Sequence, residues 1–178
     1  MTIRTFLKKT PKIGENVFVD DSSLVLGDVE IGDDSSIWPM AVLRGDVHSI
    51  RVGKRTSIQD GTVCHVTHAG PYDPDGHDLV IGDNVTVGHK AILHGCTIEN
   101  NCLVGMGAVV MDGAIIRENV IIGANSLVPP GRELASGYLW VGSPARKIRK
   151  LTEEELKFFK YSADNYVKLK NQHLESQL

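Results

Sequence analysis

The chain has 178 residues, with 42% hydrophobic and 23% charged residues, which is typical of a soluble globular protein of one domain. Its net charge of -3 and its scattered Lys and Arg residues exclude the basic footprint of a protein that binds nucleic acid or an anionic membrane. The opening MTIRTFLKKT is too charged for a signal peptide, and no apolar run reaches the length of a membrane span. We therefore expect a cytoplasmic protein with neither a nucleic-acid nor a membrane partner.

An internal repeat of six residues dominates the sequence from residue 13 onward. It pauses over residues 66–80, and it is one residue short between Leu93 and Ile98. Its aliphatic or thiol positions are Ile13, Val19, Val25, Ile31, Ile37 and Leu43, then Val52, Ile58 and Cys64, then Ile81, Val87 and Leu93, and finally Ile98, Val104, Val110, Ile116, Ile122 and Val128.

A period of six fits neither a helix nor a simple strand. It is explained if each hexapeptide is a short strand plus a corner, and if three hexapeptides close one triangular coil that stacks on the last. Gly with Asp or Asn, as in IGDN and IGDD, supplies the turn residues that such corners need. The sequence thus predicts an all-β solenoid, a parallel β-helix.

Two segments depart from the repeat. THAGPYDPDGHD, residues 67–78, is rich in Gly, Pro and Asp and predicts an exposed loop inserted directly after His65. We expect the solenoid over residues 1–136, followed within the same single domain by residues 137–178, a crossing segment and a C-terminal α-helix. Thr152 and Glu155 form a capping box for this helix, which we expect to lie on its own solenoid or on a neighbouring subunit.

The three cysteines are Cys64, Cys96 and Cys102. Their number is odd and they have no CxxC spacing, which argues against a disulfide framework and against a thiolate zinc site. We interpret them as reduced thiols that fill small spaces in the core.

Two histidines occupy equivalent positions in successive coils. If Val52, Ile58 and Cys64 open the three faces of one coil and the next three repeats open the same faces, His65 and His94 are stacked on one face. Coils are about 4.8 Å apart, so a slight lean would bring two ring nitrogens onto one tetrahedral ion.

His89 is the third histidine of this region, five residues before His94 and across a corner. That separation is roughly 10–15 Å, too far for the three rings of one chain to meet. Three imidazoles with room for water are the ligand set of a catalytic zinc site. If a metal is bound, the spacing predicts a trimer in which each neighbour supplies its own His89; the alternative is that each histidine is a surface residue.

Further motifs surround these histidines: RGD at residues 44–46, Gln59 with Asp60, His65, and GHKAILHG at residues 88–95. Together they resemble the γ-class carbonic anhydrases of the hexapeptide-repeat superfamily. The resemblance extends over about residues 11–170 and is greatest to short bacterial γ-carbonic-anhydrase-like proteins with a C-terminal helix. It implies that the β-helix is left-handed, although the handedness rule for parallel crossovers would favour the right hand.

The resemblance also implies an activity, the reversible hydration of carbon dioxide to bicarbonate by a metal-bound hydroxide at the interfaces of a homotrimer. The metal would be Zn²⁺, although three imidazoles also accept Fe²⁺ or Co²⁺. The resemblance implies that His65, His89 and His94 are the metal ligands and that Arg44 and Asp46 form an ion pair across the subunit interface. It places Gln59 beside the bound water, with Asp60 in support. It also implies that Tyr161 supplies a hydroxyl to the site. The alternatives are a solvated surface pair for Arg44 and Asp46, a corner role for Gln59 and Asp60, and simple packing for Tyr161.

One position departs from the family pattern. The glutamate that serves as proton shuttle in the prototype follows RGD, and here that position is Val47. His68, which we predict as a catalytic residue, or His77 could carry the proton instead. Whether the chain is an enzyme thus stays open, with weak activity, a non-catalytic metal-binding or scaffold protein, and a hexapeptide acyltransferase as the alternatives.

Overall fold

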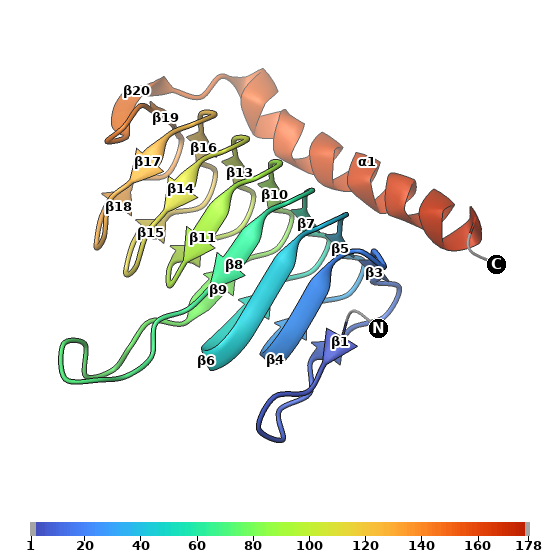
Figure 1. Ribbon diagram of the computed structural model, residues 1–178. Coiled ribbons are helices and arrows are strands. Elements are labelled where there is room, and N and C mark those ends of the chain that lie inside the picture. The colour runs from blue at the N-terminus through green and yellow to red at the C-terminus, as the bar shows by residue number, and fades with distance from the viewer. Residues whose placement is uncertain (1–2, 177–178) are drawn as a thin grey trace.

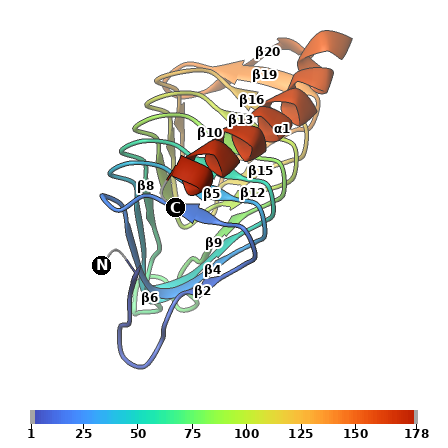
Figure 2. The same cartoon turned by 90° about the vertical axis from the view of Figure 1, so that its right-hand side faces the viewer.

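The computed structural model describes residues 3–176 and consists of triangular coils stacked in parallel, with one long helix along their side (Figure 1). Figure 2 shows the coils closer to end-on, as nested loops with the helix across one of the three faces. Two sheets form the three faces, because two long strands bend around a corner and join two of the faces into one sheet. The predicted solenoid of hexapeptide repeats with a C-terminal helix is confirmed.

We call the three faces A, B and C. The bent strands are β4 (Leu24–Ile31) and β6 (Val42–Val52), whose first halves belong to face A and second halves to face B. Face A also contains β1 (Ile3–Arg4), β8 (Val63–His65), β11 (Ile92–His94), β14 (Val109–Val110) and β17 (Leu127–Val128). Face B also contains β2 (Lys12–Ile13), β9 (Leu79–Ile81), β12 (Thr97–Ile98), β15 (Ile115–Ile116) and β18 (Glu133–Leu134). Face C contains β3 (Phe18–Val19), β5 (Ser36–Ile37), β7 (Ser57–Ile58), β10 (Thr86–Val87), β13 (Leu103–Val104), β16 (Ile121–Ile122), β19 (Tyr138–Val141) and the antiparallel β20 (Arg146–Lys150).

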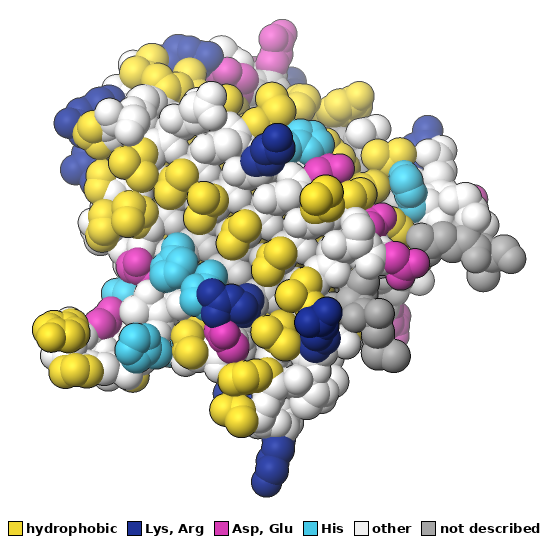
Figure 3. Space-filling model, in the orientation of Figure 1, with side chains coloured by type: hydrophobic (Ala, Val, Ile, Leu, Met, Phe, Trp, Pro, Cys, Tyr) yellow, Lys and Arg dark blue, Asp and Glu magenta, His cyan; other side chains and the backbone are white. Residues whose placement is uncertain are grey.

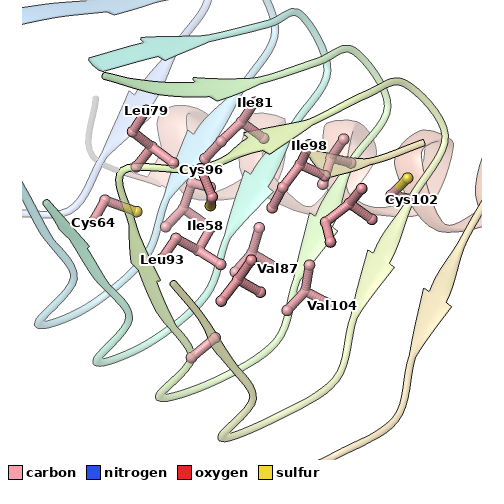
Figure 4. Close-up of a cluster of buried hydrophobic side chains, with 14 of the residues drawn as sticks. Ile58, Cys64, Leu79, Ile81, Val87, Leu93, Cys96, Ile98, Cys102 and Val104 are labelled. Atoms are coloured by element: carbon pink, nitrogen blue, oxygen red, sulfur yellow. The ribbon is translucent and has the colours of Figure 1, made fainter. Parts of the chain in front are cut away.

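The register of the coils is the one that the repeat predicts. Ile81 pairs with Val52, Val87 with Ile58, and Leu93 with Cys64, so each repeat lies on its equivalent in the preceding coil. These inward side chains fill a continuous aliphatic core, in which Ile81, Val87 and Leu93 are at most 1% exposed (Figure 4). The three cysteines are also buried in this core, unpaired, as expected.

Left-handed backbone at one corner of each coil turns the chain from face B to face C. Asn84 and Asn101 hold this position in successive coils, each with a φ of 55°. Asparagine tolerates this conformation better than most residues because its short polar side chain can hydrogen-bond the nearby backbone. The Asp and Asn residues of the repeat thus determine where the strands end.

The C-terminal helix, α1 (Glu153–Ser176), covers part of face C of its own chain. It begins at the predicted capping box, where Glu155 N donates to Thr152 Oγ1 (3.2 Å) and Thr152 N donates to Glu155 Oε2 (2.8 Å). Phe159 and Ala163 are buried against the solenoid, and the Ser162 hydroxyl bonds Thr86 Oγ1 at 2.8 Å. The helix thereby covers the small outward residues of face C and leaves face A open. It is not long and apolar enough to cross a membrane.

The segment over residues 67–78 projects from the stack between β8 and β9, as an exposed loop (Figure 1). Its base is closed by Thr67 and His77, which exchange two backbone hydrogen bonds of 2.9 Å. The tip carries Tyr72, whose side chain is fully exposed.

Candidate metal centre

His65 and His94 end strands β8 and β11 and lie directly over one another on face A. Their neighbours in sequence, Cys64 and Leu93, point into the core, so alternation along the strand turns both histidines outward. His65 Nδ1 and His94 Nε2 are 3.0 Å apart. Two nitrogens on one tetrahedral zinc ion are separated by about 3.4 Å, so the spacing of this histidine pair suits a shared ion.

The outer nitrogen of each ring faces a carboxylate. His65 Nε2 is 3.1 Å from Asp46 Oδ1, and His94 Nδ1 is 2.8 Å from Asp112 Oδ1. Arg44 Nη1 is 2.5 Å from Asp46 Oδ2 of the same chain, whereas the resemblance implied an ion pair across the subunit interface. Carboxylates of this kind orient metal-binding histidines in proteins by fixing which ring nitrogen carries the proton.

Both carboxylates are held in the ionised form. Burial would raise the pKa of Asp46, but hydrogen bonds with Arg44 and His65 outweigh it and keep the pKa below its ordinary value. The pKa of Asp112 is likewise lowered, because hydrogen bonds with Thr67 and His94 exceed the effect of desolvation. Desolvation lowers the pKa of His65, against the opposing effect of Asp46, so a positive charge on this ring is disfavoured.

A count of protons shows why this arrangement suits a cation. Three contacts link Asp46, His65, His94 and Asp112 in a row, and each needs one proton. The two ionised carboxylates supply none and two neutral imidazoles supply two. A cation between the facing nitrogens of the pair removes the deficit, because each ring then donates its single N–H to its own carboxylate. The residues present therefore fit a metal ion.

His89 lies elsewhere, at the corner that follows β10. Its Nδ1 is 2.9 Å from Asp60 Oδ2, and both side chains are 48% exposed. Within residues 3–176, no three His, Cys, Asp or Glu side chains of one chain are grouped so as to hold a metal ion. A third protein ligand for the pair, such as His89, would thus have to come from another chain.

Gln59 and Tyr161, which the resemblance placed around the metal, lie near His89 of the same chain. A groove of about 500 Å³ between α1 and face C is lined by Gln59, His89 and Tyr161 among others. Tyr161 is 65% exposed and stacks beside Phe158. A different tyrosine, Tyr166, lines the same groove, and Gln59 lowers the pKa of its hydroxyl against the larger effect of burial.

The sequence did not suggest a site role for Tyr166 or Asp112. The available signal for Tyr166 was its place among apolar and aromatic residues at helical spacing, which are Leu156, Phe159, Ala163, Tyr166 and Val167. Burial raises the pKa of the Tyr166 hydroxyl above the ordinary value. Asp112 lies at a corner where Asp is an ordinary turn residue, so nothing in the repeat distinguishes it.

The other predicted residues lie on or beside the inserted loop. His68 is exposed, and the residue at the shuttle position, Val47, is 47% exposed. His77 Nε2 is paired with Asp73 Oδ2 at 3.0 Å. Among the described residues, His68 thus follows the end of β8 closely in sequence but makes no hydrogen bond to either ring of the pair.

The stacked coils and the covering helix define a hexapeptide-repeat β-helix protein. The family model described as bacterial transferase hexapeptide (six repeats) matches residues 10–45 and 95–130. A solved structure of a hexapeptide transferase family protein from Anaplasma phagocytophilum is 42% identical, covers 96% of this chain and 97% of its own, and gives a TM-score of 0.88. The fold class is therefore the left-handed β-helix of this superfamily.

Similar proteins of known name identify the family within the hexapeptide-repeat superfamily. Protein YrdA of Escherichia coli K12 is 54% identical over 97% of this chain and 94% of its own length. The probable carbonic anhydrase of Methanocaldococcus jannaschii is 48% identical over 92% of this chain and 98% of its own. Gamma carbonic anhydrase 2 of Arabidopsis thaliana mitochondria is 45% identical over 97% of this chain and 62% of its own. The chain belongs to the γ-class carbonic anhydrase-like family.

Proposed function

We propose that the protein is a metal-dependent γ-class carbonic anhydrase, which hydrates carbon dioxide reversibly to bicarbonate at sites shared between the subunits of a homotrimer. The observation that carries the proposal is the histidine pair, whose inner nitrogens face each other at 3.0 Å while its outer nitrogens rest on Asp46 and Asp112. Family membership supports the same activity.

The pair supplies two ligands, and His89 of the partner subunit is assigned as the third. Asp60, 2.9 Å from the His89 ring, orients that histidine as Asp46 and Asp112 orient the pair. Zn²⁺ is the proposed metal, with Fe²⁺ or Co²⁺ as substitutes that an imidazole set also accepts. A divalent ion held by these residues would supply Lewis-acid chemistry, which brings the pKa of a water molecule close to neutrality.

The surface chemistry of the three faces supports the trimer. One outward position of face A is apolar in six coils and forms a row that we call the face A ladder (Figure 3): Leu24, Val42, Val63, Ile92, Val109 and Leu127. Face B instead presents charged residues such as Lys12, Glu30 and Glu133, and α1 covers much of face C. An apolar face rimmed by polar residues is typical of a protein interface.

The corner that bears His89 is a suitable counterpart for the face A ladder. Exposed methionines lie along the same corner, with Met106, 56% exposed, in the next coil and Met40, 70% exposed, two coils before. Contact between a face of one copy and a corner of the next uses two different surfaces, and such a contact closes into a ring when the rotation permits. That arrangement would bring His89 of the partner subunit to the histidine pair.

The remaining roles follow from the groove beside His89. Gln59 is 4% exposed and lines this groove together with His89, so its amide is assigned to orient the attacking water. Tyr161 lines the same groove, whose apolar walls suit carbon dioxide. With Val47 at the shuttle position, His68 or dissolved buffer would accept the proton, which should make proton transfer slow.

The test is stopped-flow carbon dioxide hydration on protein loaded anaerobically with Zn²⁺ or Fe²⁺, with bound metal measured on the same samples. His94→Ala should lose both metal and activity, while His173→Asn, at the far end of α1, should retain both. Full metal occupancy without hydration above the buffer rate would contradict the enzyme and favour the non-catalytic metal-binding protein, which the residue at position 47 also favours. An acetyl-CoA titration tests the acyltransferase alternative.

A further inference from the structure

Asp112 lies at the corner after β14 and takes part in two side-chain hydrogen bonds through one oxygen. Its Oδ1 is 2.8 Å from His94 Nδ1 and 2.7 Å from Thr67 Oγ1. Its own backbone is fixed by the next coil, because Gly131 N donates to the Asp112 carbonyl at 2.8 Å. The backbone of Asp112 is therefore held in place, and its carboxylate has two hydrogen-bond partners.

Thr67 is the first residue of the inserted loop. Its backbone is locked to His77 at the other end of the loop by two hydrogen bonds of 2.9 Å. Thr67 Oγ1 can donate only one proton, and it donates that proton to Asp112. The base of the loop, the carboxylate and the His94 ring thus form one continuous chain of hydrogen bonds.

This chain determines the chemical form of His94. An ionised carboxylate only accepts hydrogen bonds, so His94 must carry its proton on Nδ1, and the lone pair of Nε2 then faces His65. Without Asp112 the ring would be free to place its proton on either nitrogen and to turn away from its partner.

We propose that Asp112 is the positioning residue of His94 and that Thr67 positions Asp112, so that the inserted loop sets the orientation of one half of the histidine pair. This inference rests on the proposed function, because orientation of the pair matters for metal binding. The loop thereby acquires a role in the site that does not require any of its residues to touch the metal.

The first experiment reads the tautomer of His94 without metal. Protein labelled with ¹⁵N-histidine is examined by long-range ¹H–¹⁵N correlation, with His94→Gln to assign the signal. We expect the Nδ1–H form in the wild type and in Asp112→Asn, which retains an oxygen acceptor, and a mixture of both tautomers in Asp112→Ala. An unchanged Nδ1–H signal in Asp112→Ala would overturn the assignment.

The second experiment measures Co²⁺ affinity by competition with a chelator. Loss of such a supporting carboxylate should weaken binding about 10- to 100-fold in Asp112→Ala, and the hydroxyl deletion Thr67→Val should weaken it by a smaller factor. Asp73→Asn is the matched control, because it breaks the His77 contact within the loop and leaves Asp112 untouched. A Co²⁺ affinity of Asp112→Ala within about twofold of the wild type would overturn the role of Asp112. A Co²⁺ affinity of Thr67→Val within the same range would overturn the role of the loop.

The two experiments fail independently. If wild-type protein binds no Co²⁺, the proposed metal function is wrong, and the tautomer measurement still decides whether Asp112 positions His94. If Asp112→Ala does not fold, Asp112→Leu, which keeps the side-chain shape without an acceptor, and Thr67→Val test the same hydrogen bonds.

Discussion

Gly95 lies against the carboxylate of Asp112 and leaves no room for a side chain at position 95. A Cβ there would overlap Asp112 Oδ1 and come within 2.7 Å of the His77 Cβ, and the φ of Gly95 is +52°. This glycine stands in the shortened step between Leu93 and Ile98, where the repeat loses one residue. The shortened repeat between Leu93 and Ile98 is thus where the inserted loop, the Asp112 carboxylate and His94 come together.

We expect Gly95→Ala to destabilise the protein more than Gly131→Ala does. Both glycines have positive φ, so each alanine incurs a backbone cost of about 1–2 kcal/mol. Nothing lies within 4 Å of the Gly131 position, whereas Gly95→Ala also displaces Asp112 and His77. Urea unfolding of the two variants measures the difference, and equal losses would show that the crowding at Gly95 is unimportant.

A charge on the face A ladder should dissociate the proposed trimer. Ile92 is 41% exposed and lies two residues before His94, so Ile92→Lys places an ammonium group in the apolar interface. Thr97→Lys puts the same group at an outward position of face B and should leave the assembly intact. Light scattering after gel filtration distinguishes a trimer from a monomer of about 19.4 kDa. A trimer in both variants would place the interface elsewhere.

Restoration of a carboxylate at the shuttle position should accelerate hydration. Val47 is 47% exposed and directly follows Asp46, so Val47→Glu places an acid beside the pair without disturbing the core. General acid-base groups contribute about 10²- to 10⁴-fold, and even a tenfold gain at low buffer concentration would be informative. Val47→Gln has the same shape without a titratable proton and should show no gain. A gain in both variants would indicate a steric effect.

The start of α1 should weaken in acid. Arg149 and the Thr152 backbone lower the pKa of Glu155 from 4.5 to about 2. Because the folded pKa is the lower one, ionised Glu155 stabilises the fold above about pH 4.5, and this contribution is lost as the pH falls from 4.5 toward 2. Glu155→Gln should therefore melt at most about 2–4 °C below the wild type at pH 7, with the gap closing near pH 2.

Thermal melts followed by circular dichroism at several pH values measure that gap. Glu153→Gln, in the same turn but outside the capping box, is the control and should show little change at any pH. A gap for Glu155→Gln that does not depend on pH would mean that its charge has no part in the cap.

Much of this architecture was predictable from the sequence because it depends on local periodicity. An aliphatic residue every sixth position must point inward in every coil, and this determines the register that stacks His65 on His94. The capping box likewise involves two residues only three apart, Thr152 and Glu155, so it could be recognised without the fold. The conclusion that one chain cannot gather all three histidines needed only the length of the intervening segment.

The tertiary structure alone decided which side chains support these residues. Asp112 meets Thr67 across 45 residues of sequence, and the inserted loop makes that separation irregular with respect to the repeat. Tyr166 is partly buried, whereas Tyr161 is 65% exposed, because the angle at which α1 crosses face C sets which tyrosine faces inward. Such contacts depend on helix placement and side-chain direction in space. A six-residue pattern specifies which residues point inward, but it does not specify what each outward side chain meets.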